Sequence, residues 1–222
     1  MSPAAVRLGL SGPVVQVAPQ LLGLHLVVAG ITVRLTEVEA YAGQGEDPGS
    51  HAHRGRTPRT EVMFGPAGRA YVYLSYGMHW CLNVVTGVEG QAAAVLLRAG
   101  EVVEGLETAR ARRPGVADRD LCRGPARLTR TLAVTGAHRG VDLRDPASPV
   151  RLLVPPGVGD PARVRSGPRT GVAGDGALTP WRFWLEGEPT VSTYRRAASR
   201  SPVGRRVPSD EVPPGGCGTI VG

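Results

Sequence analysis

The stretch that decides the fold is Tyr71-Val-Tyr-Leu-Ser-Tyr-Gly-Met-His-Trp-Cys-Leu-Asn83. It holds three of the five tyrosines and one of the three tryptophans of the chain. Tyr71 and Tyr73 are two residues apart, so on a β-strand their side chains share one face. Gly77 interrupts the alternation, because glycine tolerates the positive φ that a tight hairpin needs. The pattern predicts a strand, a tip at Tyr76-Gly77 and a returning strand over residues 79–86.

The tip has two interpretations. Periodicity alone favours a core hairpin with aromatic packing. A tyrosine at a turn is seldom part of a core, however, and a planar ring presented there can stack on a base or wedge between base pairs. The role of Tyr76 therefore depends on the rest of the chain.

Composition narrows the function classes. A chain of 222 residues with 41% hydrophobic residues is expected to form one soluble globular domain. The net charge is +7, and because the sequence contains no lysine, arginine supplies all of the side-chain positive charge apart from histidine. Arginine makes planar, bidentate contacts to phosphate. The basic balance suggests a nucleic-acid partner.

Cysteine content and hydropathy predict a compartment. The three cysteines are odd in number and show no paired spacing, which is typical of a reducing cytoplasm. We find no signal-peptide pattern and no apolar run long enough to span a bilayer, so no membrane partner is expected. The predicted location is cytoplasmic, with nucleoid association if the source is bacterial.

Two segments carry candidate catalytic charges. Residues 31–41 alternate apolar and polar as in a half-buried strand, with Glu37, Glu39 and Tyr41 on one face. Such carboxylates usually form a solvated face, and the alternative is that one lines a cleft. The apolar run 91–99 contains a single charge, Arg98, which is costly to bury unless it is paired. It either extends to solvent or forms a salt bridge with a pocket carboxylate such as Glu39.

The remaining segments are predicted as follows. Residues 43–60 form a polar loop with His51, His53 and three arginines, and it is expected to face nucleic acid, since no cysteine or carboxylate completes a metal-ligand spacing. Residues 14–28 read as a helix followed by a strand, and 101–113 and 124–134 as helices. Residues 150–154 and 181–185 read as strands, and 195–222 as a largely disordered basic tail. Phosphate contacts are expected from Arg54, Arg56, Arg59, Arg127 and Arg130.

A family resemblance now becomes visible. In order, the chain contains Thr36-Glu-Val-Glu-Ala-Tyr41, Asp47-Pro-Gly-Ser-His51, Arg54-Gly-Arg-Thr-Pro-Arg59, Met63-Phe64-Gly65, the stretch 71–79, Asn83, Leu96-Leu-Arg98 and Gly124-Pro125. Over roughly residues 14–192 this closely resembles the alkyladenine (3-methyladenine) DNA glycosylase family. The resemblance implies a single mixed α/β (α+β) domain with a curved antiparallel sheet, flanking helices and a protruding β-hairpin. That fold is similar to the C-terminal domain of methionyl-tRNA formyltransferase. It implies a glycosylase domain over 1–194 before the tail at 195–222, and no metal or other cofactor.

The resemblance also assigns roles. Glu39 matches the general base that activates water, and Arg98 the arginine that helps to hold that water and the base. Tyr76 matches the residue that fills the gap left in the duplex, and Asn83 the residue that excludes guanine. A base-binding pocket is implied by Tyr41, His51 and Tyr73, with His53 as the alternative to His51.

The predicted function is that of a monofunctional DNA glycosylase. It would act as a monomer on duplex DNA with alkylated or deaminated purines, flip the base out, hydrolyse the N-glycosidic bond and leave an abasic site. The absence of lysine independently favours hydrolysis over strand cleavage through a Schiff base. The alternatives are a non-catalytic nucleic-acid-binding domain and a metal-dependent hydrolase built on His51 and His53. Glu39 together with Arg98 discriminates, since a simple binder has no use for a carboxylate that repels phosphate.

Overall fold

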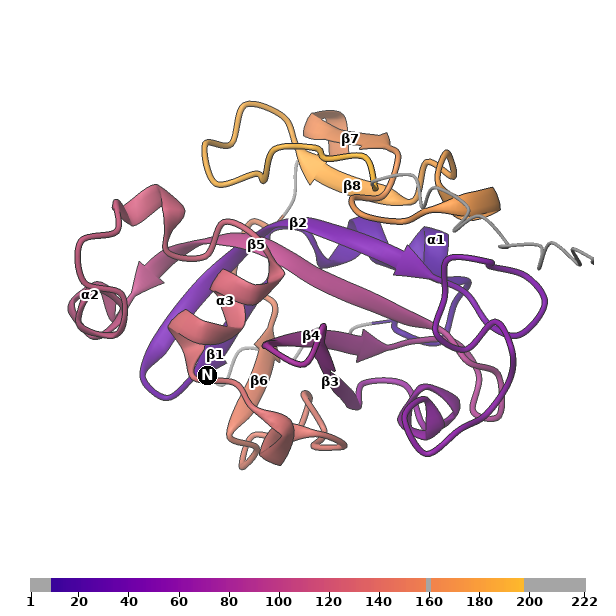
Figure 1. Cartoon of the computed structure of the whole chain (residues 1–222). Helices are drawn as coiled ribbons and strands as arrows, with labels where there is room; N and C mark the ends of the chain where they lie inside the picture. Colours follow the sequence, from indigo (N-terminus) through magenta and orange to yellow (C-terminus); the bar gives the residue numbers. More distant parts are fainter. Residues whose placement is uncertain (1–8, 159–160, 198–222) are drawn as a thin grey trace, which may run out of the picture.

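Strand β2 (Ile31–Tyr41) is the centre of the molecule in the computed structural model, which describes residues 9–158 and 161–197 (Figure 1). It pairs along its length with β5 (Ala94–Glu104). On its other edge, β2 pairs first with β1 (His25–Val28) and then, at Glu37–Glu39, with β8 (Arg182–Leu185). Nine of its eleven residues are buried. The sequence predicted a half-buried strand here, and the structure buries more of the strand than that prediction allowed.

Eight strands form one antiparallel sheet. Their order is β3-β4-β5-β2-β1-β6, and β8, which carries β7 at its outer edge, branches from β2. The remaining strands are β3 (Ala70–Ser75), β4 (His79–Val85), β6 (Val150–Leu153) and β7 (Val164–Gly167). The α-helices of the described residues are α1 (Val14–Val17), α2 (Leu106–Arg112) and α3 (Pro125–Leu132). Single 3-10 turns occur at Ala18–Leu21, Glu61–Phe64, Asp118–Asp120, Gly136–His138, Pro161–Arg163 and Gly174–Gly176.

Helix α3 covers one face of the sheet against β4 and β5 (Figure 1). It begins at Pro125, whose fixed φ and missing N–H suit a first helical position. Its buried side, including Leu128 and Leu132, joins a core that contains Leu35 and Leu97 from the two central strands. Burying one such aliphatic side chain contributes about 1.5–3 kcal/mol relative to leaving it in water. This core holds the central strands in place and with them the charged residues described below.

Three irregularities break the pairing of β2 with β5, one between Thr32 and Val33 and two on either side of Glu37. The register shifts between Leu35 and Glu37 and again between Glu37 and Val38, so Thr36 and Arg98 each have no direct partner on the opposite strand. A bulge of this kind bends the strand and redirects a side chain. Here it occurs where β2 carries Glu37 and β5 carries Arg98.

The predicted mixed α/β domain with an antiparallel sheet is confirmed, as are the strands on both sides of the Tyr76-Gly77 tip. The helix predicted for 101–113 is wrong in its first third, because β5 continues to Glu104 and α2 begins only after Gly105. The helix predicted at the start of 14–28 is reduced to α1 and a 3-10 turn containing Pro19. Strand β7 was not predicted. Most of the predicted tail, residues 198–222, lies outside the described residues.

Candidate active site

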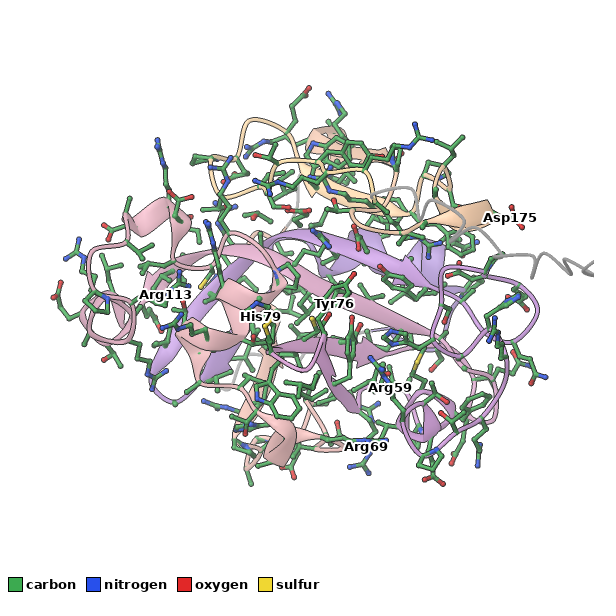
Figure 2. The ribbon with its side chains drawn as sticks, viewed as in Figure 1. Arg59, Arg69, Tyr76, His79, Arg113 and Asp175 are labelled. Atoms are coloured by element: carbon green, nitrogen blue, oxygen red, sulfur yellow. The ribbon has the colours of Figure 1, made fainter. Side chains whose placement is uncertain are left out.

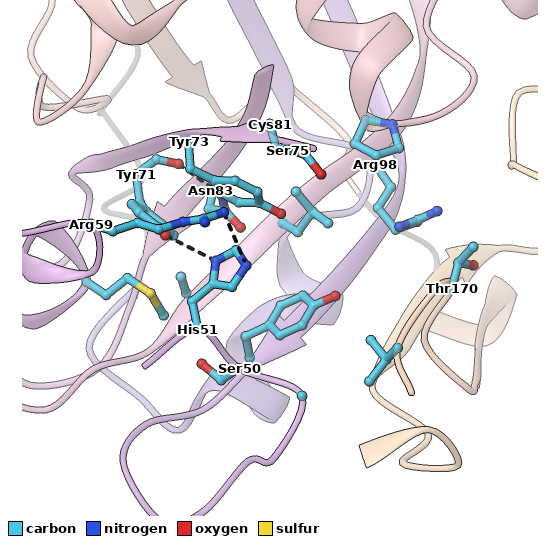
Figure 3. A pocket seen from close by; sticks show the side chains of 18 of the residues that line it. Ser50, His51, Arg59, Tyr71, Tyr73, Ser75, Cys81, Asn83, Arg98 and Thr170 are labelled. Carbon is cyan, nitrogen blue, oxygen red and sulfur yellow. Dashed lines mark hydrogen bonds between the residues drawn. The ribbon is translucent and has the colours of Figure 1, made fainter. Parts of the chain in front are cut away.

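A cavity of about 650 Å³ opens between the β3–β4 hairpin, the loop before it and the segment 170–173 (Figure 3). It brings together residues from six distant parts of the chain. They include Tyr41, Ser50, His51, Arg59, Tyr71, Tyr73, Tyr76, Asn83, Arg98, Pro125 and Thr170. Every residue that the sequence assigned to base binding thus lines one cavity, whereas His53 does not line it.

Aromatic rings form one wall of the cavity. Tyr71 and Tyr73 lie on adjacent outward positions of β3 with their ring centroids 5.4 Å apart, and the His51 ring meets Tyr73 edge-on at 4.6 Å. The Nδ1 atom of His51 lies 3.2 Å from the Tyr71 hydroxyl, as Figure 3 shows. These contacts fix three rings around a space that a flat ligand can enter.

His51 is held in its neutral form. The surrounding protein and, secondarily, the positive charge of Arg59 lower its pKa to about 4. The Arg59 guanidinium lies 5.2 Å from the centre of the Tyr73 ring and 3.5 Å from Nε2 of His51. At neutral pH the aromatic wall therefore contributes no histidine charge to the cavity.

Glu39 lies directly behind the cavity wall with a fully buried side chain. One carboxylate oxygen, Oε2, accepts hydrogen bonds from Arg98 at 3.0 Å and from the Tyr41 hydroxyl at 2.9 Å. The other, Oε1, accepts one from the backbone N–H of Thr170 at 2.6 Å. A carboxylate offers about four acceptor positions. Three are occupied, so Oε1 retains room for one more donor.

Burial raises the pKa of Glu39, against the lowering effects of the Arg98 charge and of the hydrogen bonds from Thr170 and Tyr41. A raised pKa makes the ionised carboxylate a stronger proton acceptor. A general base works best when its pKa lies near the operating pH. The raised pKa of Glu39 and its place behind the cavity wall are both features expected of a general base.

Arg98 forms a salt bridge with a carboxylate, as one of the two sequence interpretations proposed, but it has two partners. Its Nε donates to Glu37 at 2.8 Å and its Nη1 donates to Glu39 at 3.0 Å. Burial opposes the guanidinium charge, and the two carboxylates outweigh it and raise the pKa of Arg98. The sequence did not identify Glu37 as the residue that holds Arg98 in this orientation.

Glu37 is itself fully buried and fully satisfied. Its Oε1 accepts from Arg98, from Arg182 at 2.7 Å and from the Ser192 hydroxyl at 2.8 Å, and its Oε2 accepts from the Ser192 N–H at 2.6 Å. Its pKa is lowered, because burial, which raises it, is outweighed by Arg98 and Arg182. Glu37 therefore has a structural setting, while Glu39 next to it retains an open acceptor position.

A second buried ion pair supports Tyr41 from behind. Arg169 forms a two-pronged salt bridge with Asp47 at 2.6 and 2.7 Å, and both side chains are almost fully buried. The Arg169 guanidinium lies 4.6 Å from the centre of the Tyr41 ring and 5.4 Å from that of Trp181. Gly49 passes so close that a Cβ there would lie 2.5 Å from the guanidinium. Local sequence gave no signal for this pair, whose members are 122 residues apart.

Asn83 is buried at the cavity floor, and its side-chain Nδ2 donates to the backbone carbonyl of Tyr71 at 2.9 Å. This hydrogen bond joins the two strands of the hairpin and fixes the amide against the cavity. Asn83 thus has a structural contact in addition to its position next to the space that a base would fill.

The tip of the β3–β4 hairpin, where Figure 2 labels Tyr76, lies at the surface. Tyr76 is 88% exposed and Met78 71% exposed. Both Tyr76 (φ 49°) and Gly77 (φ 68°) adopt the left-handed conformation, which a bulky residue rarely does. The core-tyrosine interpretation of the tip is therefore wrong. Such strain persists only where the surrounding structure enforces it, and it is frequent at functional sites.

Comparison with known proteins is consistent with this geometry. Residues 9–189 match the family described as methylpurine-DNA glycosylase.

This chain belongs to the methylpurine-DNA glycosylase family.

Relatives that carry the name 3-methyladenine DNA glycosylase agree with the assignment. The protein from Streptomyces avermitilis is 54% identical over 194 residues, which cover 85% of this chain and 90% of the relative. The protein from Frankia casuarinae is 54% identical over 193 residues, covering 82% and 89%. The protein from Mycobacterium tuberculosis is 48% identical over 193 residues, covering 85% and 92%. The family predicted from the sequence is confirmed, and with it the assignment as a DNA glycosylase and hydrolase.

The arginines predicted to contact phosphate in this DNA glycosylase lie in different settings. Arg59 lies at the cavity rim, and the Arg56 guanidinium stacks on Phe64 at 4.9 Å. Arg54 and Arg130 are exposed and form no ion pair within the described residues. Arg127 lies 3.5 Å from Asp120. Their DNA contacts remain a prediction.

Two further features of the described residues concern metals and membranes. No group of three His, Cys, Asp or Glu side chains that could hold a metal ion occurs in 9–158 and 161–197. Within the same ranges, no helix has the length and apolar character required to cross a bilayer.

Proposed function

We propose that this glycosylase removes alkylated purines of the 3-methyladenine type from duplex DNA by hydrolysis and leaves an abasic site, as a step of base excision repair. The observation that carries the proposal is the buried carboxylate of Glu39, which has one open acceptor position behind a wall of Tyr41, Arg98 and Thr170. A protein that only bound DNA would have no need of such a group. Glu39 is the proposed general base.

The chemistry begins with a water molecule at Oε1 of Glu39. Within the described part of the chain the hydroxyl of Thr170 is buried without a hydrogen-bond partner, and Thr170 belongs to the cavity wall, so this hydroxyl can serve as the second contact of that water. As the water oxygen bonds to C1′ of the sugar, its proton passes to Glu39. The electron pair of the N-glycosidic bond leaves with the base, and an alkylated cationic purine departs as a neutral molecule.

The cavity is suited to a cationic purine. Aromatic faces attract cations by about 0.5–2 kcal/mol each, and Tyr41, Tyr73 and the neutral His51 present three rings. A protonated histidine would repel the same ligand. The volume of about 650 Å³ lies within the range of small-molecule sites and accommodates a nucleotide base.

The base reaches this cavity only when it is flipped out of the duplex, which costs a few kcal/mol of unstacking and unpairing. Tyr76 is placed to offset that cost, because its exposed ring can occupy the vacated space. We propose that the protein acts on the lesion strand as a monomer. Asn83 is the proposed barrier to guanine, because its side chain at the cavity floor would clash with the exocyclic amine of that base.

The product is an abasic site and not a cut strand. Strand cleavage by a glycosylase needs an amine that attacks the sugar. The sequence contains no lysine, so simple hydrolysis by a Glu39-activated water is the reaction that its side chains support.

The test is incubation with duplex DNA carrying 3-methyladenine or 7-methylguanine, in EDTA, with free base and abasic sites scored separately. We expect equal amounts of the two and no strand breaks until alkali is added. DNA binding without base release would favour the non-catalytic alternative, and a requirement for added divalent metal would favour the metal-dependent one.

A further inference from the structure

A second cavity, of about 600 Å³, lies next to the candidate active site. It opens between the end of α2, the start of α3 and the segment that follows Val191. Its charged and hydroxyl side chains come from Arg113, Asp120, Arg123, Arg127, Ser192, Thr193 and Arg195. Neither the resemblance nor the proposed reaction gives this cavity a role.

The cavity holds an excess of positive charge. Among its described lining residues there are four arginines and a single carboxylate, that of Asp120. Asp120 lies 3.4 Å from Arg123 and 3.5 Å from Arg127, and outside the cavity it is also 3.6 Å from Arg119. One carboxylate at these loose distances does not neutralise its neighbours.

The Arg113 guanidinium is held by backbone carbonyls. Within the described residues no carboxylate lies within ion-pair distance of it, and its Nη1 donates instead to the backbone carbonyls of Leu121 and Arg127. Burial, followed by the charges of Arg130 and Arg127, lowers the pKa of Arg113. An anion in the cavity would relieve this repulsion.

Arginines elsewhere on the surface are paired differently. Arg110, on α2 just before Arg113, donates two hydrogen bonds to Asp118 at 2.7 and 2.9 Å and one to Glu107 at 2.5 Å. Arg144 forms a two-pronged pair with Asp142 at 3.0 Å. Arginines elsewhere on the surface thus have close acidic partners, whereas the arginines of this cavity share one carboxylate at a longer distance.

The two cavities share a wall. Pro125 lines the active-site cavity, whereas Arg123 and Arg127 on either side of it line the second one. Ser192 lines the second cavity, and its hydroxyl accepts a hydrogen bond from Arg98 of the first at 3.4 Å. A flipped nucleotide stays joined to its neighbours, so the backbone of the lesion strand must pass along the rim between these cavities.

We propose that this second cavity binds a backbone phosphate of the lesion strand, close to the flipped nucleotide, through Arg113, Arg127 and Arg123. The inference rests on the proposed function. Guanidinium groups offer planar pairs of N–H donors that match phosphate oxygens, and the hydroxyl of Thr193 adds a further donor. The phosphate replaces the counter-charge that Asp120 supplies incompletely, and it anchors the strand on the side of Arg98.

The experiment measures binding to a duplex with one stable abasic-site analogue, in which single phosphates are replaced in turn by neutral methylphosphonates. Wild-type protein is compared with Arg113→Gln and Arg127→Gln. Arg110→Gln is the matched control, since it removes the same charge three residues before Arg113, from a side chain that does not line the cavity. Melting temperatures of all the proteins are recorded, and Arg127→Gln keeps the test open if Arg113→Gln fails to fold, because the Arg127 side chain is exposed and its ion pair with Asp120 is long, at 3.5 Å.

We expect wild-type affinity to fall when one particular lesion-strand phosphate is neutralised, and both cavity variants to be insensitive to that replacement. The slope of log affinity against log salt should decrease by about 0.9 in each variant, the value for one phosphate contact in duplex DNA. A variant that combines Arg113→Gln with Arg127→Gln should lose no more slope than either single variant, because both arginines hold the same phosphate. Arg110→Gln should retain the wild-type pattern.

Unchanged methylphosphonate sensitivity in the cavity variants would overturn the proposal. So would binding of free inorganic phosphate that depends on Arg113 while no DNA position responds, since the site would then serve a free anion. Failure of the proposed function is a separate result: a protein that binds DNA through this phosphate but releases no base would leave the cavity's role intact.

Discussion

The network around Glu39 and the hairpin tip at Tyr76 are neighbouring parts of the molecule that differ in burial and in the number of polar contacts. In the network, Glu37, Glu39 and Arg98 are at most 5% exposed and every carboxylate oxygen accepts at least one hydrogen bond. At the tip, Tyr76 is 88% exposed in a backbone conformation that its side chain disfavours. The groups proposed to act in the reaction are buried and held in one geometry, whereas the side chain proposed to enter DNA is exposed. A substitution in the network should therefore affect chemistry and stability, and one at the tip should affect only the opening of DNA.

The largest effect is expected from Glu39→Gln. The amide keeps the shape of the side chain but cannot accept the proton of the attacking water, and loss of a general base costs about 10²–10⁴-fold in rate. Single-turnover release of 3-methyladenine, together with binding to an abasic-analogue duplex, measures the change. Binding should be retained.

Glu37→Gln is the matched control for that experiment, because Glu37 is equally buried on the same face of β2 and accepts four hydrogen bonds from Arg98, Arg182 and Ser192. It should lower the melting temperature, and it should reduce the rate of base release far less than Glu39→Gln does. If Glu37→Gln abolished release while Glu39→Gln did not, the base would be Glu37.

The next effect concerns stability. Asp47→Asn leaves the Arg169 guanidinium buried and unpaired behind Tyr41, and breaking a buried ion pair by removing one partner costs about 3–5 kcal/mol. Urea unfolding should show this loss. Glu186→Gln, which breaks an exposed pair with Arg165, should leave stability nearly unchanged. Equal changes for the two variants would mean that Arg169 finds another partner or water.

The tip and the shared face of Tyr71 and Tyr73 could be predicted because both depend on local patterns, whereas Tyr41 and His51 entered the predicted pocket through the family resemblance. The positions of Tyr71 and Tyr73 follow from strand alternation, and a left-handed Tyr76-Gly77 turn follows from the glycine. Strand β5 was cut short at residue 99 because the charged residues 101–104 resemble a helix. Pairing with β2, including the contact of Thr32 with Glu104 at 2.6 Å, overrides that local preference.

Partners in the buried network could not be predicted, since they depend on pairing between distant segments. Arg98 reaches Glu37 because the register shifts at this point of β2 and β5, and no residue type signals such a bulge. Arg169 and Arg182 come from the last quarter of the chain and had no recognisable motif. The family resemblance named Glu39 and Arg98 without the residues that hold them.

At the tip, Tyr76→Ala should weaken the flipped complex by about 1–3 kcal/mol, the value of one stacked aromatic. The ring makes few protein contacts, so the melting temperature should hardly change. Single-turnover release is compared on duplex, bulged and single-stranded substrates, and the defect should shrink in that order because less stacking has to be replaced. An equal defect on all three substrates would show that Tyr76 acts on cleavage, as the network does.

The pH dependence should report the network and not the aromatic wall. Glu39 must be ionised to accept a proton, and its pKa is raised by burial, so release of a cationic base should fall about tenfold per pH unit once the pH drops below that pKa. His51, with a pKa of about 4, stays neutral above pH 5 and should contribute nothing there. Rates from pH 5 to 8, corrected for spontaneous depurination, test this. His51→Gln should keep the same acidic limb, and a displaced limb would assign the titration to His51.

The smallest effect is expected at Asn83, which lies between the two regions: it is buried like the network but belongs to the hairpin that ends in Tyr76. Asn83→Ser shortens the side chain beside the cavity floor, so guanine-derived bases should be released faster relative to adenine-derived ones, by about tenfold, the low end for a pocket that gains the room of one small group. The same change removes the donor to the Tyr71 carbonyl and should cost about 1 kcal/mol of stability. The two effects are separable, because lost stability alone would slow or leave unchanged the release of both kinds of base. Comparison of 7-methylguanine and 3-methyladenine release with thermal melting distinguishes them. A variant that melts earlier but discriminates as the wild type does would assign Asn83 to holding the two strands together, and guanine exclusion would then lie with the aromatic wall.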